Sequence, residues 1–170
     1  MCGIAGIFSL DRQRTIDGAI LERMANVLAH RGPDDCGTFV DGPAGLAHRR
    51  LSIIDIAGGM QPMSDPSGKV WIAYNGEVYN FRELGQELVA KGHALQTHSD
   101  TEVVLHAYLE WGDACVERFN GMFAFAIWDG RHQRLFAARD RLGIKPFFWA
   151  MIDGQFVFAS EVKGIAQHPG

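Results

Sequence analysis

The chain has 170 residues, of which 47% are apolar and 21% are charged, and its formal net charge is −4. These values are typical of one globular domain with a substantial core, and they exclude a disordered chain. Because acidic and basic residues are interspersed without a basic block, nothing favours a nucleic acid or an anionic membrane as a partner.

The N-terminal part of the chain alternates short apolar runs with an amphipathic helix. We expect a strand over residues 4–9 and a helix over residues 17–29, where apolar residues recur at helical spacing. The Arg-Gly-Pro-Asp-Asp run that follows ends this helix. Residues 51–54 and 70–74 are β-branched or aromatic and are predicted to be buried strands, separated by a loop with glycine and proline.

Two helices and then a series of strands are predicted in the second half. One helix begins near Phe81 and is closed by Gly92. The next helix begins at Ser99, which forms the pattern of a capping box with Glu102. Hairpin turns then separate four strands and a short final helix, which we expect over residues 122–128, 134–139, 147–151, 155–159 and 160–167.

This order of elements predicts an α+β fold. Strands dominate both ends of the chain, and the turns between them are of the hairpin type rather than the regular crossovers of a parallel sheet. We therefore expect antiparallel sheet covered by helices, in one domain over residues 1–170.

The lack of membrane and signal segments, together with the cysteine spacing, points to the cytoplasm. No apolar run approaches the roughly 20 residues of a membrane span, and the opening lacks the features of a signal peptide. The cysteines, Cys2, Cys36 and Cys115, have neither redox nor zinc-finger spacing. We predict no disulfide, no metal site and no membrane contact.

Cys2 directly follows the initiator Met1 at the start of an apolar strand. Removal of Met1 would place a thiol and a free α-amine on the same residue. An α-amine has a pKa of about 7.7 to 8.0, so part of it is neutral near physiological pH and can take the thiol proton. Taken alone, a cysteine is more often a small buried apolar residue.

Six further motifs accompany Cys2 in a fixed order. They are Arg31-Gly32-Pro33-Asp34, His48-Arg49-Arg50-Leu51-Ser52-Ile53, Tyr74-Asn75-Gly76-Glu77-Val78-Tyr79-Asn80, Ser99-Asp100-Thr101-Glu102, Gly121-Met122-Phe123-Ala124-Phe125-Ala126 and Ala138-Arg139-Asp140-Arg141-Leu142-Gly143-Ile144-Lys145-Pro146. Together they resemble the glutaminase domain of glutamine-dependent asparagine synthetases, in the class II glutamine amidotransferase family of N-terminal nucleophile hydrolases. The resemblance covers essentially the whole chain and implies a four-layer αββα sandwich of two antiparallel sheets.

The resemblance implies that glutamine is hydrolysed to glutamate and ammonia at Cys2, through a γ-glutamyl thioester. The side-chain N–H of Asn75 and the backbone N–H of Gly76 would then stabilise the negative charge that forms on the carbonyl oxygen. Taken alone, Asn75-Gly76 after a strand is more typical of a hairpin turn.

The resemblance also implies how glutamine is bound. Arg50 would take the α-carboxylate, which suits a forked guanidinium. Asp100, with Glu77 contributing, would take the α-ammonium, and Leu51 and Ile53 would belong to the same substrate site. Read individually, Arg50 is equally a solvated strand end, and Asp100 a carboxylate favourably placed at a helix N-terminus.

Four further segments have a supporting role in this interpretation. Residues 58–64 resemble a loop near the substrate and are a candidate lid, and Arg31 is a candidate brace for the site. Arg49 is expected on the opposite face of its strand from Arg50. Residues 139–146 resemble a region that faces a partner domain, although a strand-connecting loop is an equal interpretation.

Two rival interpretations stay open. His98, Glu102 and His106 lie at helical spacing and suggest a metal site, but no recognised motif completes its ligands. Alternatively, the chain is a non-catalytic glutamine-binding or regulatory domain of the same fold, since an uncleaved Met1 would block the base and a fold alone does not establish activity.

The resemblance implies a partner as well. Ammonia would pass to an ATP-dependent synthetase domain, in cis or trans, that amidates aspartate or a related carboxylate. No Ser-Gly-Gly-x-Asp-Ser loop occurs in this chain, so ATP and Mg²⁺ are expected only in that domain and no cofactor in this one. We expect the chain to be the N-terminal part of a longer asparagine synthetase-like protein, and a homodimer is left open.

Overall fold

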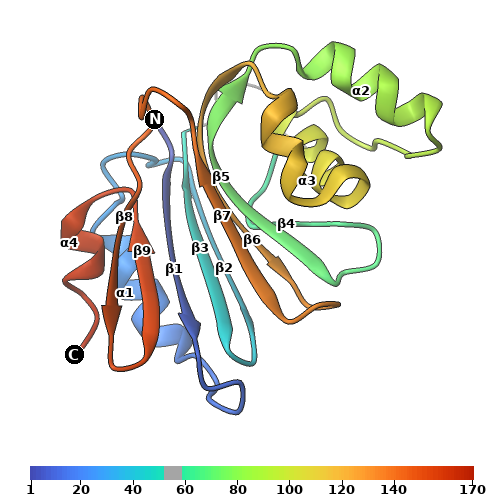
Figure 1. Ribbon diagram of the computed structural model, residues 1–170. Helices are drawn as coiled ribbons and strands as arrows, with labels where there is room; N and C mark the ends of the chain where they lie inside the picture. Colours follow the sequence, from blue (N-terminus) through green and yellow to red (C-terminus); the bar gives the residue numbers. More distant parts are fainter. Residues whose placement is uncertain (52–58) are drawn as a thin grey trace.

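Two antiparallel sheets lie face to face in the computed structural model, which describes residues 1–51 and 59–170 (Figure 1). The first sheet has the strand order β2 (Asp35–Asp41), β3 (Ala44–Arg50), β1 (Gly3–Ser9), β9 (Gln155–Ala159) and β8 (Phe148–Ile152). The second has the order β4 (Met63–Ser64), β5 (Val70–Val78), β6 (Gly121–Asp129) and β7 (Arg134–Arg139). Every strand pair within the two sheets is antiparallel.

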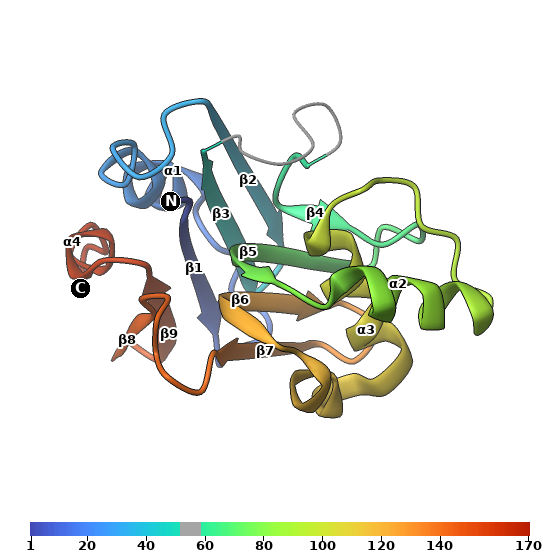
Figure 2. The ribbon, with the colours of Figure 1, turned by 90° about the horizontal axis from the view of Figure 1, so that it is seen from above.

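Helices cover the outer face of each sheet (Figure 2). On the first sheet lie α1 (Gly18–Asn26) and α4 (Val162–Ile165). On the second lie α2 (Phe81–Ala90) and α3 (Asp100–Trp111), and the 3-10 helix η1 (Gly112–Arg118) continues directly from α3. The expected four-layer αββα sandwich is therefore confirmed. Within the described ranges, no helix is both long and apolar enough to cross a membrane.

Alternation along the strands separates three apolar layers. In β6, Phe123, Phe125 and Ile127 pack against the α2–α3 side, while the residues between them face the other sheet. In β1, Ala5 and Ile7 pack against α1. The middle layer between the sheets contains Ile4, Phe8, Ala44, Leu46, Ala73, Ala124, Ala126, Trp128 and Phe158. Because successive side chains of a strand point to opposite faces, each central strand contributes to two layers.

The structure corrects the prediction for residues 35–54. Strand β2 and most of β3 were not predicted, although Arg49 and Arg50 were expected on a strand, since β3 contains mainly small, histidine and arginine residues, and β2 has largely exposed side chains. Their pairing with each other and of β3 with β1 stabilises them instead. The strand predicted over residues 51–54 is wrong at Leu51, which lies beyond the end of β3, and its remainder lies outside the described residues.

The N-terminus of α3 is capped partly as predicted. The Ser99 hydroxyl oxygen accepts a hydrogen bond from the Thr101 N–H at 3.2 Å. The Glu102 carboxylate, however, accepts the backbone N–H groups of Gln96 and Thr97, each at 2.7 Å. Glu102 thus holds the preceding loop onto the helix, and the two sets of contacts place Asp100 in the first turn.

Candidate active site

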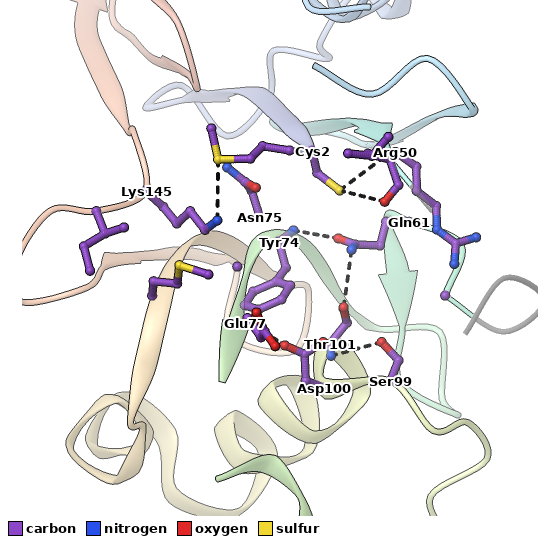
Figure 3. A pocket seen from close by; sticks show the side chains of 16 residues that line it. Cys2, Arg50, Gln61, Tyr74, Asn75, Glu77, Ser99, Asp100, Thr101 and Lys145 are labelled. Atoms are coloured by element: carbon purple, nitrogen blue, oxygen red, sulfur yellow. Dashed lines mark hydrogen bonds between the residues drawn. The ribbon is translucent and has the colours of Figure 1, made fainter. Parts of the chain in front are cut away.

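A cavity of about 420 Å³ lies at the end of the sandwich where β1 begins and where β3 and β5 end (Figure 3). The structure brings seven of the eight predicted site residues to its wall: Cys2, Arg50, Leu51, Asn75, Gly76, Glu77 and Asp100. Ile53, the eighth, lies outside the described residues. The wall also contains residues that the sequence did not predict as site residues: Met1, Gly59, Gln61, Tyr74, Ser99, Thr101, Met122, Ile144 and Lys145.

Cys2 is half-buried, and neighbouring residues contact both its thiol and its backbone. The backbone N–H of Leu51 points at its Sγ atom at 3.4 Å, and the thiol itself donates to the Leu51 carbonyl oxygen at 3.8 Å. The Cys2 carbonyl oxygen accepts a hydrogen bond from Arg31 Nε at 3.0 Å, and Arg31 Nη1 in turn binds Glu161 at 2.9 Å. Arg31 therefore fixes the start of β1 against the segment that precedes α4.

Asn75 and Gly76 lie within β5, where they pair with Ala124 and Phe123 of β6. The interpretation as a hairpin turn is therefore wrong. A Cβ atom at Gly76 would meet the Met122 carbonyl oxygen at 2.7 Å and the Phe123 Cα atom at 2.8 Å. Glycine is thus required here by the close approach of a neighbouring backbone, not by an unusual dihedral angle.

The Asn75 side chain carries an unpaired donor. The residue is 2% exposed, and among the described residues its Nδ2 atom is buried without a hydrogen-bond partner. Buried polar atoms in native proteins almost always have a partner, so an exception calls for an explanation. Since the side chain stands in the cavity that also holds Cys2 (Figure 3), a bound ligand would supply the missing acceptor.

Arg50 and Arg49 point to opposite sides of the first sheet. Arg50 is only 6% exposed and lines the cavity, so the interpretation as a solvated strand end is wrong. Arg49 Nε donates to the carbonyl oxygen of Ala25 at 3.1 Å, and its Nη2 atom contacts Asn26 Oδ1. Arg49 thus attaches α1 to β3, while Arg50 lines the cavity.

Asp100 joins α3 to β5 across the cavity. Its Oδ2 atom accepts a hydrogen bond from the Tyr74 hydroxyl at 2.6 Å and another from the Val78 N–H at 3.0 Å. Burial raises the pKa of the Asp100 carboxyl, while these two donors act in the opposite direction. Burial and the charge of Asp100 raise the pKa of Tyr74 well above its ordinary value, so Tyr74 stays a neutral donor. Glu77 lines the cavity from an exposed position.

Gln61 is a site residue that sequence reasoning missed. Its Oε1 atom accepts the Tyr74 N–H at 2.7 Å, and its Nε2 atom donates to Thr101 Oγ1 at 3.3 Å. Gln61 therefore braces β5 immediately before Asn75 and connects it to the start of α3. The sequence signal that could have identified Gln61 was its position in the segment 58–64, which resembles a loop near the substrate. Residue 58 lies outside the described part of the chain, and whether the segment acts as a lid stays a prediction.

Lys145 was also missed, although it belongs to a motif of the resemblance. Asp140 positions the loop that carries Lys145. The Oδ2 atom of Asp140 accepts the N–H groups of Phe123 at 3.2 Å and of Lys145 at 2.9 Å. Its Oδ1 atom accepts the Ile144 N–H at 2.9 Å. Residues 139–146 thus connect β7 to β8 as a strand-connecting loop that is fastened to β6 beside Gly76.

Glu102 and His106, two of the residues in the metal interpretation, have other contacts. Glu102 binds the backbone N–H groups described above, and His106 Nδ1 lies 2.9 Å from His93 Nδ1. Over residues 1–51 and 59–170, no group of three or more His, Cys, Asp or Glu side chains is placed to hold a metal ion. The metal interpretation therefore has no geometric support in this part of the chain.

A thiol at the start of a central strand in one sheet faces an amide donor on the other sheet, with helices outside both sheets. This is the architecture of an N-terminal nucleophile hydrolase. A model of the glutamine amidotransferase domain family matches residues 1–170. The chain belongs to this family.

Relatives of known name agree with the family. The chain is 46% identical over 171 residues to asparagine synthetase [glutamine-hydrolyzing] 3 of Bacillus subtilis, covering 99% of this chain and 28% of that protein. It is 38% identical to asparagine synthetase [glutamine-hydrolyzing] 2 of Oryza sativa subsp. japonica, covering 98% of this chain and 28% of that protein. The chain thus spans little more than a quarter of the length of these relatives.

Solved structures support the fold. The glutamine phosphoribosylpyrophosphate amidotransferase of B. subtilis, complexed with ADP and GMP, superimposes with a TM-score of 0.80. The match covers 97% of this chain and 43% of that one, at 24% sequence identity. At this identity, the likeness concerns the fold alone.

Proposed function

We propose that this chain hydrolyses L-glutamine to glutamate and ammonia, with Cys2 as the nucleophile once Met1 has been removed. The observation that carries the proposal is the unpaired, buried Nδ2 atom of Asn75 in the cavity that holds the Cys2 thiol. A donor without a partner beside a nucleophile is suited to a negative charge that exists only during the reaction.

The proposed reaction balances without a cofactor. The Cys2 α-amine takes the thiol proton, and the thiolate attacks the carboxamide carbon of glutamine. Asn75 Nδ2 and the Gly76 N–H hold the oxygen of the tetrahedral intermediate. When the intermediate collapses, the C–N bond breaks and ammonia leaves with the proton from the α-amine. Water then hydrolyses the γ-glutamyl thioester to glutamate and restores the thiol.

The charged residues of the cavity are suited to the amino-acid end of the substrate. We propose that Arg50 binds the α-carboxylate and that Asp100, with Glu77, binds the α-ammonium. Leu51 and Ile53 would complete this part of the site. Support comes from the burial of Arg50 and from the rigid attachment of Asp100 to Tyr74 and the backbone of β5.

We further propose that the ammonia serves an ATP-dependent synthetase domain, in cis or trans, that amidates aspartate or a related carboxylate. The names of the similar proteins support this, and ATP and Mg²⁺ would act in that domain alone. The free thiols Cys2, Cys36 and Cys115 are consistent with a cytoplasmic location. A homodimer is a separate prediction that sedimentation would test.

One observation favours a second candidate, a glutamine-binding domain without turnover. Met1 lines the cavity, and while it is attached, the nitrogen of Cys2 is an amide and not a base. The two candidates therefore differ in whether the functional chain begins at Cys2.

The decisive experiment compares three proteins: one that begins at Cys2, verified by intact mass, the same protein with Cys2→Ala, and one that retains Met1 through an N-terminal extension. We expect glutamate release from glutamine only with the first protein. Equal release by Cys2→Ala would overturn the assignment of the nucleophile. Binding of glutamine without release by the first protein would favour the second candidate, and loss of release on addition of EDTA would revive the metal interpretation.

A further inference from the structure

Lys145 is a buried cation in the active-site cavity. It is 6% exposed, and its Nζ atom lies 3.6 Å from the Sδ atom of Met1. A thioether is only a weak acceptor, and in the described part of the chain no ion pair involves Lys145. Burying an ammonium without a carboxylate is costly, so a role in the cavity has to account for it.

The backbone around Lys145 holds this cation in place. Asp140 binds the Lys145 N–H, the Ile144 N–H and the Phe123 N–H, and the Asp140 N–H donates to the Phe123 carbonyl oxygen at 2.8 Å. Phe123 is the pairing partner of Gly76. The loop therefore cannot swing away from the cavity without breaking its attachment to the strand beside the site.

We propose that Lys145 is a positioning residue that keeps the α-amine of Cys2 in its neutral, proton-accepting form. This inference rests on the proposed function. The Lys145 ammonium contacts the side chain of Met1, the residue whose peptide bond carries the Cys2 nitrogen. Once Met1 is removed, the new α-amine of Cys2 shares the cavity with the Lys145 ammonium, and a nearby like charge disfavours protonation of the amine.

Other titratable or charged groups line this cavity or contact Cys2 from neighbouring elements. They are Arg50 of β3, Arg31 before β2, Glu161 before α4, the neutral Tyr74 and Glu77 of β5, and Asp100 of α3. Arg31 and Glu161 form an ion pair, Tyr74 and Asp100 bind each other, and Glu77 is exposed to solvent. Arg50 is assigned to the substrate carboxylate. Among the described cations of the cavity, Lys145 therefore has no carboxylate or substrate group assigned to it.

The test is the pH dependence of kcat/KM for glutamine, measured on proteins that begin at Cys2. Lys145→Met preserves the length of the side chain without its charge, and we expect the acidic limb of the profile to move up by roughly half to one pH unit. Lys145→Arg should restore the wild-type limb. Lys69→Met makes the same change of net charge at the opposite end of β5 and should leave the profile unchanged.

An acidic limb that does not move in Lys145→Met would overturn the proposal, and so would a rise in KM alone, since the cation would then act on the substrate. If Lys145→Met does not fold, Lys145→Gln provides the same comparison. NMR titration of the ¹⁵N-labelled Cys2 α-amine measures the effect without turnover. A wild-type protein without glutaminase activity would therefore defeat the proposed function, while an unchanged amine titration would defeat this inference.

Discussion

At the scale of single residues, the site maintains donors that the folded protein itself does not satisfy. Asn75 Nδ2 and Arg31 Nη2 are both buried without partners among the described residues. Leaving a buried donor unpaired costs about 1 to 3 kcal/mol of stability. At Asn75, this cost is consistent with a group that is prepared for an oxygen atom of a ligand, since no reorganisation is needed when charge develops there.

Asn75→Ala should therefore lower kcat for glutamine hydrolysis by about 100- to 1000-fold. The lost donor has no partner among the described residues, so its removal relieves an unpaired buried group, while the truncation also loses buried contacts; since these effects oppose each other, the free energy of unfolding should change by less than about 1 kcal/mol. Steady-state kinetics and urea denaturation of the same preparation measure both quantities.

Asn80 provides the matched control for this substitution. Its Nδ2 atom donates to the Arg118 carbonyl oxygen and its Oδ1 atom accepts the Asn120 N–H, both at 3.0 Å. Asn80→Ala should thus reduce stability with little change in kcat. A kcat for Asn75→Ala within threefold of the wild-type value would contradict the role of Asn75.

At the scale of elements, a histidine connects the two sheets beside the site. His48 lies on β3, is 1% exposed, and its Nε2 atom donates to the carbonyl oxygen of Tyr74 on β5 at 3.1 Å. Burial lowers the pKa of His48 to about 4. The neutral ring therefore joins the strand that ends at Arg50 to the strand that carries Asn75.

This contact predicts a pH-dependent stability. The pKa of His48 is about 4 in the folded protein, against an ordinary value of 6.5. Between these values, the unfolded chain binds more protons than the folded one, so the free energy of unfolding should fall as the pH is lowered from 6.5 to 4. His48→Gln should reduce this slope, and the two proteins should show parallel curves above pH 7. Parallel curves throughout the range from pH 6.5 to 4 in urea denaturation would argue against the prediction.

At the scale of the whole molecule, the middle apolar layer sets the spacing between the two sheets. Cys2 precedes β1 of one sheet and Asn75 belongs to β5 of the other, so this spacing controls how the nucleophile faces its donor. Phe158 is fully buried in the layer and stacks on Phe147, with ring centroids 5.1 Å apart. A Cβ atom at Gly6 would lie 2.4 Å from the Phe158 ring, so the glycine makes room for it.

Phe158→Ala should lower the free energy of unfolding by about 3 to 5 kcal/mol, because it removes a large side chain and leaves a cavity between the sheets. It should also lower kcat/KM in the fraction that remains folded. Leu142→Ala, at a side chain that is 85% exposed, should change the free energy of unfolding by less than about 0.5 kcal/mol. Denaturant titration measures both free energies of unfolding. If the two variants lose similar amounts, packing in the middle layer is not the main source of the protein's stability.

Sequence patterns predicted most elements because their signals are local. The β-branched and aromatic residues at the start of β5 and the Ser99 cap act between neighbours in the chain, and each was predicted. Most of β3 was missed because its residues have little intrinsic strand preference, and its strand conformation depends on pairing with β1 and β2. For the same reason, the sequence did not show that Gln61 would brace Tyr74.

The order of the motifs determined the family, the candidate nucleophile and seven cavity residues, because these depend on which residue types occur and in what order. Only the tertiary structure decided that Asn75 and Gly76 form a strand and not a turn, that the Asn75 amide is unpaired, and that Lys145 lies in the cavity. The physical reason is that each of these facts depends on contacts between residues distant in sequence, such as Lys145 and Met1, which form only when the two sheets pack together.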